Sequence, residues 1–178
     1  LFALTTKATK TIHVYVALCD NKYQGIVPVP ERIGNGQNPN TNLYWGCGYG
    51  VRSFFKLKTK DWNLIKTYQP TNPKILERVL FKHATKDVYI LADAYDGMHI
   101  KTCTEDFLKA SNKQNPLKIV LDSNTNLKFG GKSDLVSYIG HDGLMDFDVN
   151  IKFNKIDSTA KKTDVIILAC YSKNYFKP

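Results

Sequence analysis

A histidine and a cysteine each follow a short apolar run in the second half of the sequence. The first run, within VSYIGHDG (136–143), leads to His141, and the second run, VIILAC (165–170), ends on Cys170. An imidazole beside a thiol is the minimum needed for nucleophilic acyl transfer, in which the base draws off the thiol proton and the thiolate attacks a carbonyl carbon. We therefore predict that Cys170 is a nucleophile and His141 a general acid/base.

Each residue taken alone has a simpler explanation. A cysteine at the end of an apolar strand is usually a small buried side chain, and a lone histidine is usually a surface group or a cap. The pairing of the two residues, with Gly140 and Gly143 on either side of His141, shifts the interpretation toward function.

An acyl-transfer site also needs donors for the negative oxygen that develops on the attacked carbonyl, and backbone N–H groups commonly fill this role. The N–H of Cys170 itself is one candidate. The N–H of Gly143, in the glycine turn after His141, is the other.

Aspartates near the ends of the apolar runs are weaker candidates for substrate binding. Asp20, Asp93 and Asp142 could each select a basic side chain, although aspartates at strand ends more often cap a helix or form an Asx turn. Asp142 and Asp146 could instead orient His141 or bind a cation, and solvated turn residues are the more common case for both.

Four runs rich in β-branched and aromatic residues predict strands that would place these groups. They are near-continuously apolar, which is typical of strands covered on both faces in a parallel sheet. Ligands bind beyond the carboxyl ends of such strands, so the residues that follow the runs should meet at one edge. We predict an α/β fold with a mainly parallel sheet between helices, and strands at 12–19, 87–92, 135–140 and 164–170.

Helices are expected between these strands. Residues 42–56 carry bulky apolar side chains at roughly helical spacing, despite three glycines, and residues 104–111 begin with a threonine that can cap a helix. Residues 75–83 fit either a helix or one arm of a hairpin. Residues 20–41 and 152–163 are predicted loops, and a long loop such as the first is usually functional or disordered.

The composition is that of an ordinary globular protein, with 43% apolar and 23% charged residues. The formal net charge is +9, but the lysines are scattered and form no nucleic-acid motif, so we expect no nucleic-acid partner. No apolar run is long enough to predict a membrane span. Because no predicted strand leads into a glycine-rich phosphate-binding motif, a nucleotide-binding α/β protein is disfavoured.

The four cysteines lie at positions 19, 47, 103 and 170, without the spacing of a zinc site. We therefore expect no metal and no cofactor. The first residues, LFAL (1–4), could be the tail of a removed targeting segment, which would place the protein in the periplasm or outside the cell. An arbitrary start of the chain explains them equally well, so the localisation stays open.

The order of these motifs, an apolar run with His and a nearby Gly and then a run ending in Ala-Cys, resembles the caspase-like (clan CD) cysteine peptidases. This family includes caspases, legumain, clostripain, gingipains and separase, and the likeness is greater to its bacterial-type members than to caspases proper. The resemblance implies a single caspase-like domain over residues 1–178, folded as a three-layer α/β/α sandwich. It also implies a peptide or protein substrate, cleaved by Cys170 with His141 as the acid/base.

Three features depart from the family's pattern, and the first is the separation of 29 positions between His141 and Cys170, which is shorter than in caspases. The family's glycine usually follows the histidine directly, whereas Asp142 stands between His141 and Gly143 here. The family's sheet also continues well beyond the nucleophile, whereas this chain ends at Pro178. We therefore expect a fragment, the N-terminal part of a cleaved precursor, or a second subunit that completes the sheet. The same features favour the alternative of a catalytically inactive binding or scaffolding module.

Overall fold

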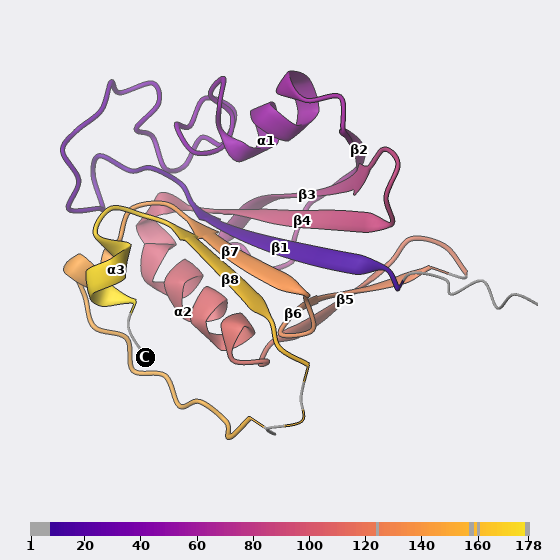
Figure 1. The fold of residues 1–178 in the computed structure, drawn as a ribbon. Coiled ribbons are helices and arrows are strands. Elements are labelled where there is room, and N and C mark those ends of the chain that lie inside the picture. The colour runs from indigo at the N-terminus through magenta and orange to yellow at the C-terminus, as the bar shows by residue number, and fades with distance from the viewer. Residues whose placement is uncertain (1–7, 124, 157–158, 160, 177–178) are drawn as a thin grey trace, which may run out of the picture.

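A computed structural model describes residues 8–123, 125–156, 159 and 161–176. The proposed targeting remnant, residues 1–4, lies outside them. One six-stranded sheet, in the order β2-β3-β4-β1-β7-β8, forms the centre of an α/β fold (Figure 1). Four of its strands run parallel, and they confirm the positions predicted from the apolar runs: β1 (Lys10–Ala17), β4 (Val88–Tyr95), β7 (Leu135–Ile139) and β8 (Asp164–Leu168). The expectation that each of them is covered on both faces is wrong for β8, whose side chains are mostly exposed.

An antiparallel hairpin extends the sheet on the β4 side. It consists of β2 (Trp62–Tyr68) and β3 (Ile75–His83), and β3 pairs antiparallel with β4. The ambiguous segment 75–83 is therefore a hairpin arm and not a helix. Strand β2 was not predicted, because its sequence, WNLIKTY, mixes polar and apolar residues and has no continuous apolar run.

One face of the sheet is covered by the segment that follows the long loop after β1. Trp45 and Val51 are buried there against β1, β3 and β4. The helix predicted over 42–56 is wrong, because only α1 (Val51–Ser53) and a π-helical turn over Phe54–Lys58 form. A Cβ at Gly46 would lie 2.2 Å from the Asn40 carbonyl oxygen, so this glycine serves a tight chain reversal and not a helix face.

The opposite face is covered by α2 (Ile100–Ser111) and a separate hairpin, β5 (Pro116–Val120) and β6 (Asn126–Gly130). Figure 1 shows α2 and α1 on opposite sides of the sheet. Buried α2 side chains, Phe107 among them, pack on Tyr15 and Tyr138 of the sheet. The helix predicted from residue 104 exists but begins four residues earlier, after a 3-10 turn capped by the Asp96 carboxylate.

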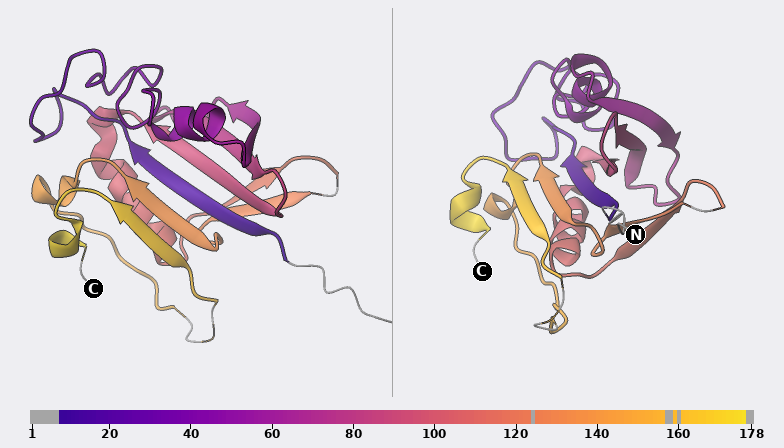
Figure 2. Two further views of the ribbon diagram at one scale, coloured as in Figure 1. Left: turned by 45° about the horizontal axis from the view of Figure 1, so that its top comes forward. Right: turned by 45° about the vertical axis from the view of Figure 1, so that its right-hand side comes forward.

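The connection from β7 to β8 carries a 3-10 turn over Gly143–Met145 and no further helix or strand in its described residues. The predicted loop over 152–163 agrees with this. Strand β8 lies at the outer edge of the sheet, with the short helix α3 (Ser172–Tyr175) beyond its end (Figure 2). No helix in the described parts of the chain is long and apolar enough to cross a bilayer.

Candidate functional site

The register of two parallel strands places His141 and Cys170 at matching positions. Ile139 pairs with Leu168, and both candidate residues follow this pair by two positions. The same sheet edge therefore presents the imidazole and the thiol. Both side chains line a cavity of about 290 Å³, whose other walls are Cys19, Gly25, Ile26, Val27, Val29, Tyr44, Met145 and Tyr171.

Close backbone packing fixes the turn that carries His141. Gly140 lies so close to β1 that a Cβ there would be 3.0 Å from the Ala17 carbonyl oxygen. The Tyr138 hydroxyl donates a hydrogen bond of 2.7 Å to the His141 carbonyl oxygen. Glycine at 140 thus lets the chain leave β7 against its neighbour, and the tyrosine holds the histidine backbone in place.

Asp146 orients the ring of His141. Its Oδ2 lies 2.8 Å from His141 Nε2 and also accepts the Gly25 N–H at 3.0 Å. An ionised carboxylate only accepts hydrogen bonds, so Nε2 carries the proton and the Nδ1 lone pair is left to act as a base. Asp146 is a partly exposed turn residue, and it also orients His141 as the sequence allowed. Its second bond, to the Gly25 N–H, reaches a loop 121 positions away in sequence.

The thiol of Cys170 is exposed, whereas those of Cys19 and Cys103 are buried. Burial, and then the neighbouring Asp20 carboxylate, raises the pKa of Cys19 to about 11. Among the described residues no hydrogen bond joins Cys170 to His141. Catalytic hydrogen bonds are often long before substrate binds, and the two groups share the wall of one cavity.

The backbone just after the thiol is strained. Tyr171 has a φ of 55°, in the left-handed region that residues with a Cβ rarely adopt. Such a conformation costs roughly 1–2 kcal/mol and is common at functional sites. It turns the chain sharply from β8 into α3, which leaves Cys170 at a corner that faces solvent.

The two oxyanion candidates are placed differently. Cys170 lines the cavity, whereas Gly143 does not. Gly143 is buried at the start of the 3-10 turn, where a Cβ would lie 2.4 Å from the Phe147 ring. The glycine is needed there for packing, and the geometry supports Cys170 N–H more than Gly143 N–H as a donor.

Two aspartates proposed for substrate binding are structural in this fold. Asp142 is fully buried, and its Oδ1 accepts the Leu144 N–H, whereas Oδ2 has no partner among the described residues. Burial raises the pKa of this carboxyl group. Asp20 is also buried and accepts the Lys22 N–H and the Gln37 side-chain amide, which folds the start of the loop. Neither residue lines the cavity of Cys170.

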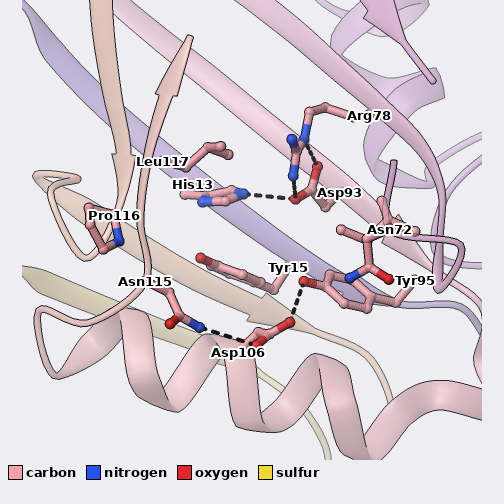
Figure 3. A pocket seen from close by; sticks show the side chains of 11 residues that line it. His13, Tyr15, Asn72, Arg78, Asp93, Tyr95, Asp106, Asn115, Pro116 and Leu117 are labelled. Atoms are coloured by element: carbon pink, nitrogen blue, oxygen red, sulfur yellow. Dashed lines mark hydrogen bonds and ion pairs between the residues drawn. The ribbon is translucent and has the colours of Figure 1, made fainter. Parts of the chain in front are cut away.

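Asp93 lies inside β4 and lines a second cavity of about 350 Å³ on the α2 side of the sheet (Figure 3). Arg78 donates two hydrogen bonds to its carboxylate, at 2.6 and 2.7 Å, and His13 Nε2 lies 3.1 Å away. Burial alone would raise the pKa of Asp93, but Arg78 and His13 outweigh it and hold the pKa below its usual value. The expectation that Asp93 ends a strand beside Cys170 is therefore wrong.

The partner of His13 was not predicted, because β1 and β4 residues that face one another are 80 positions apart. The Gly130 N–H donates to His13 Nδ1 at 3.1 Å, so Nε2 carries the proton that faces Asp93. A second pair in this cavity joins the Tyr95 hydroxyl to Asp106, whose pKa is raised by burial. Figure 3 shows that the two pairs lie on either side of Tyr15.

Within the described residues no group of three His, Cys, Asp or Glu side chains could hold a metal ion. The lining of the Cys170 cavity contributes a thiol and an imidazole, and the Asp146 carboxylate contacts that imidazole. Comparison of the chain with protein-family models, with curated proteins and with solved structures finds no match.

Proposed function

We propose that this chain is a cysteine peptidase of the caspase-like type, with the three-layer sandwich of that family. Cys170 attacks the peptide carbonyl, and His141 serves as the general acid/base. The observation that carries the proposal is that the two residues follow a paired strand position and line one cavity. Asp146, which orients the imidazole, adds the third group of a nucleophile–base–carboxylate arrangement.

The reaction follows from the tautomer that Asp146 sets. His141 Nδ1 accepts the thiol proton, and the Cys170 thiolate forms a C–S bond to the carbonyl carbon of the substrate. The tetrahedral oxyanion then collapses, the C–N bond breaks, and the imidazolium returns its proton to the amine that leaves. Asp146 stabilises the imidazolium while it exists, because the carboxylate already accepts a hydrogen bond from Nε2.

Hydrolysis of the thioester completes the cycle. His141 Nδ1 takes a proton from water, and the water oxygen attacks the thioester carbon. The C–S bond breaks, the acid product leaves, and the imidazolium reprotonates the Cys170 thiolate. No redox step and no further reactant besides water are needed.

A second candidate function is a caspase-like binding or scaffolding module without turnover. The absence of a Cys170–His141 hydrogen bond among the described residues favours it, as does the position of Gly143 outside the cavity wall. The two functions differ in whether the reactivity of the thiol depends on the imidazole.

Alkylation of Cys170 by iodoacetamide separates them. The rate for each thiol would be followed by peptide mass spectrometry at neutral pH, with a cysteine peptide of the same local sequence as the reference for an exposed but unassisted thiol. A peptidase should alkylate Cys170 at least roughly tenfold faster than the reference, since the thiolate is the nucleophile. His141→Ala should abolish the excess. A Cys170 rate equal to the reference, and unchanged by His141→Ala, would exclude the peptidase proposal.

A further inference from the structure

The cavity beside Cys170 has apolar walls contributed by four parts of the chain. The loop after β1 supplies Ile26, Val27 and Val29, and the segment before α1 supplies Tyr44. Met145 and Tyr171 come from the segments that carry His141 and Cys170. Besides the imidazole, the thiols and the tyrosine hydroxyls, the described residues of this lining carry no titratable group. The cavity therefore holds no carboxylate, ammonium or guanidinium group.

Large apolar side chains also surround the mouth of the cavity. Val27 is 88% exposed, Tyr171 69% and Met145 43%. Single exposed apolar residues are ordinary on a protein surface, but residues that gather from separate segments around one hollow mark binding surfaces. Here they converge on the exposed thiol, so a ligand that covers the thiol also removes this apolar area from water.

Three carboxylates follow lining residues directly in the sequence, and each already accepts hydrogen bonds from the protein. Asp146 is bonded to His141 and to the Gly25 N–H, and Asp20 and Asp142 are buried in their own turns. A charged ligand side chain that entered the cavity would therefore lose its hydration without gaining an ion pair. An apolar side chain would gain from burial against the same walls.

We propose that this cavity receives the substrate side chain beside the scissile bond, and that it selects an uncharged apolar side chain over an acidic or basic one. This inference rests on the peptidase function proposed above. With a volume of about 290 Å³, the cavity is at the small end of ligand pockets, which span roughly 300–1,000 Å³. It suits one aliphatic side chain of the size of leucine or methionine. Ile26, Val27 and Val29 are the specificity-determining residues.

The test uses three peptidyl acyloxymethyl ketones that differ only in the residue next to the reactive ketone: leucine, aspartate or arginine. The second-order rate of Cys170 labelling by each ketone would be divided by the rate with iodoacetamide, which has no side chain to place. We expect the leucine ketone to exceed the other two by roughly 10–200-fold, the range that hydrophobic pockets achieve. Equal ratios, a faster charged ketone, or no labelling by any of the three would overturn the inference.

A matched pair of variants locates the selectivity. Val27→Asp places a carboxylate at the mouth, where an 88% exposed side chain can change without loss of folding, and should raise the arginine-to-leucine ratio at least about tenfold. Val120→Asp makes the same change at a 57% exposed valine of β5, outside this cavity, and should leave the ratio unchanged. An unchanged ratio in Val27→Asp would count against the assignment of the loop as the specificity wall.

The same samples separate failure of the inference from failure of the peptidase proposal. Iodoacetamide labelling that is independent of His141 removes the proposed function itself. Labelling that depends on His141, together with a preference for a charged ketone or with no preference, leaves the function standing and removes only the apolar specificity.

Discussion

Asp146 and His141 are joined at 2.8 Å between Oδ2 and Nε2, and the same carboxylate oxygen accepts the N–H of Gly25. The loop after the first strand is thereby attached to the turn that carries the imidazole. One side chain thus links the wall of the cavity to the orientation of its base. A change in the loop should therefore alter the alkylation rate of Cys170.

Replacement of Asp146 by asparagine should slow the acyl-transfer chemistry with little loss of stability. Asparagine lacks the negative charge that stabilises the imidazolium, and we expect the His141-dependent alkylation of Cys170 to fall roughly tenfold or more. The free energy of unfolding should change by less than about 1 kcal/mol, because Asp146 is partly exposed. Asp148→Asn, an exposed carboxylate two positions further on, is the control and should alter neither quantity.

Gly25→Ala should reproduce the defect of Asp146→Asn without a change to any titratable group. A Cβ at Gly25 would lie 2.4 Å from Asp146 Oδ1, so the carboxylate or the loop must shift, and we expect the shift to disturb the contact between Asp146 and His141. Gly48→Ala is the matched control, because a Cβ there meets nothing within 4 Å. The measurement is again the alkylation rate of Cys170. Equal rates in the two alanine variants would show that the loop does not hold the catalytic carboxylate.

Asp142→Asn should stabilise the protein at neutral pH. Burial holds the folded-state pKa of Asp142 above that of the unfolded chain, which is about 3.9. The folded state therefore binds this proton more tightly, and wild-type stability falls as the pH rises from about 4 through the folded-state pKa.

Asparagine can keep the bond to the Leu144 N–H and does not titrate. We expect a gain in the free energy of unfolding at pH 7 and almost no gain near pH 4. Urea unfolding at the two pH values measures the difference. An equal gain in the free energy of unfolding at both pH values would show that the effect comes from packing and not from the buried charge.

Asp93→Asn should lower the free energy of unfolding, and by more than Asp142→Asn raises it. Removal of this charge leaves Arg78 buried without its partner, which typically costs about 3–5 kcal/mol. The folded-state pKa of Asp93 is lowered, so its contribution is complete above about pH 4 and is lost as the pH falls through the folded-state value. The difference between variant and wild type should therefore shrink in acid.

Arg78→Met tests the coupling of this pair. The double variant Arg78→Met/Asp93→Asn should lose less stability than the two single variants together, because neither charge is left alone. The free energies of unfolding of the wild type, the two single variants and the double variant at pH 7 give the coupling energy between Arg78 and Asp93. Simple additivity would mean that the two side chains act independently, against the bidentate geometry at 2.6 and 2.7 Å.

The strands that carry the candidate site were predictable from their continuous apolar runs. The run of β8, however, forms an edge strand with mostly exposed side chains and not a strand covered on both faces. The meeting of His141 and Cys170 at one edge followed from the same pattern. The prediction for Asp93 failed because it depended on the exact residue at which β4 ends. Strand β4 runs on to Tyr95, so Asp93 lies on a face of the sheet and not at its edge.

Other features depend on contacts that no local pattern reveals. The spacing over 42–56 suits a helix, but the close approach of Gly46 to Asn40 overrides that preference. The partnership of Asp146 with Gly25 and His141 needs the loop to return across 121 positions. The turn after His141 contains two aspartates, Asp142 and Asp146, and the local sequence does not show which of them contacts the imidazole.

The central position of β1 has a consequence for the order of events during synthesis. Its neighbours in the sheet arrive late: His13 meets Asp93 after 80 further positions, and the Thr11 N–H meets Asp134 after 123. Such non-local pairing slows folding and leaves an apolar strand without partners while the ribosome is still adding residues. The lining of the Cys170 cavity likewise comes from an early part of the chain, residues 19–44, and a late part, residues 141–171. Cys170 is therefore synthesised after every other residue of this lining except Tyr171.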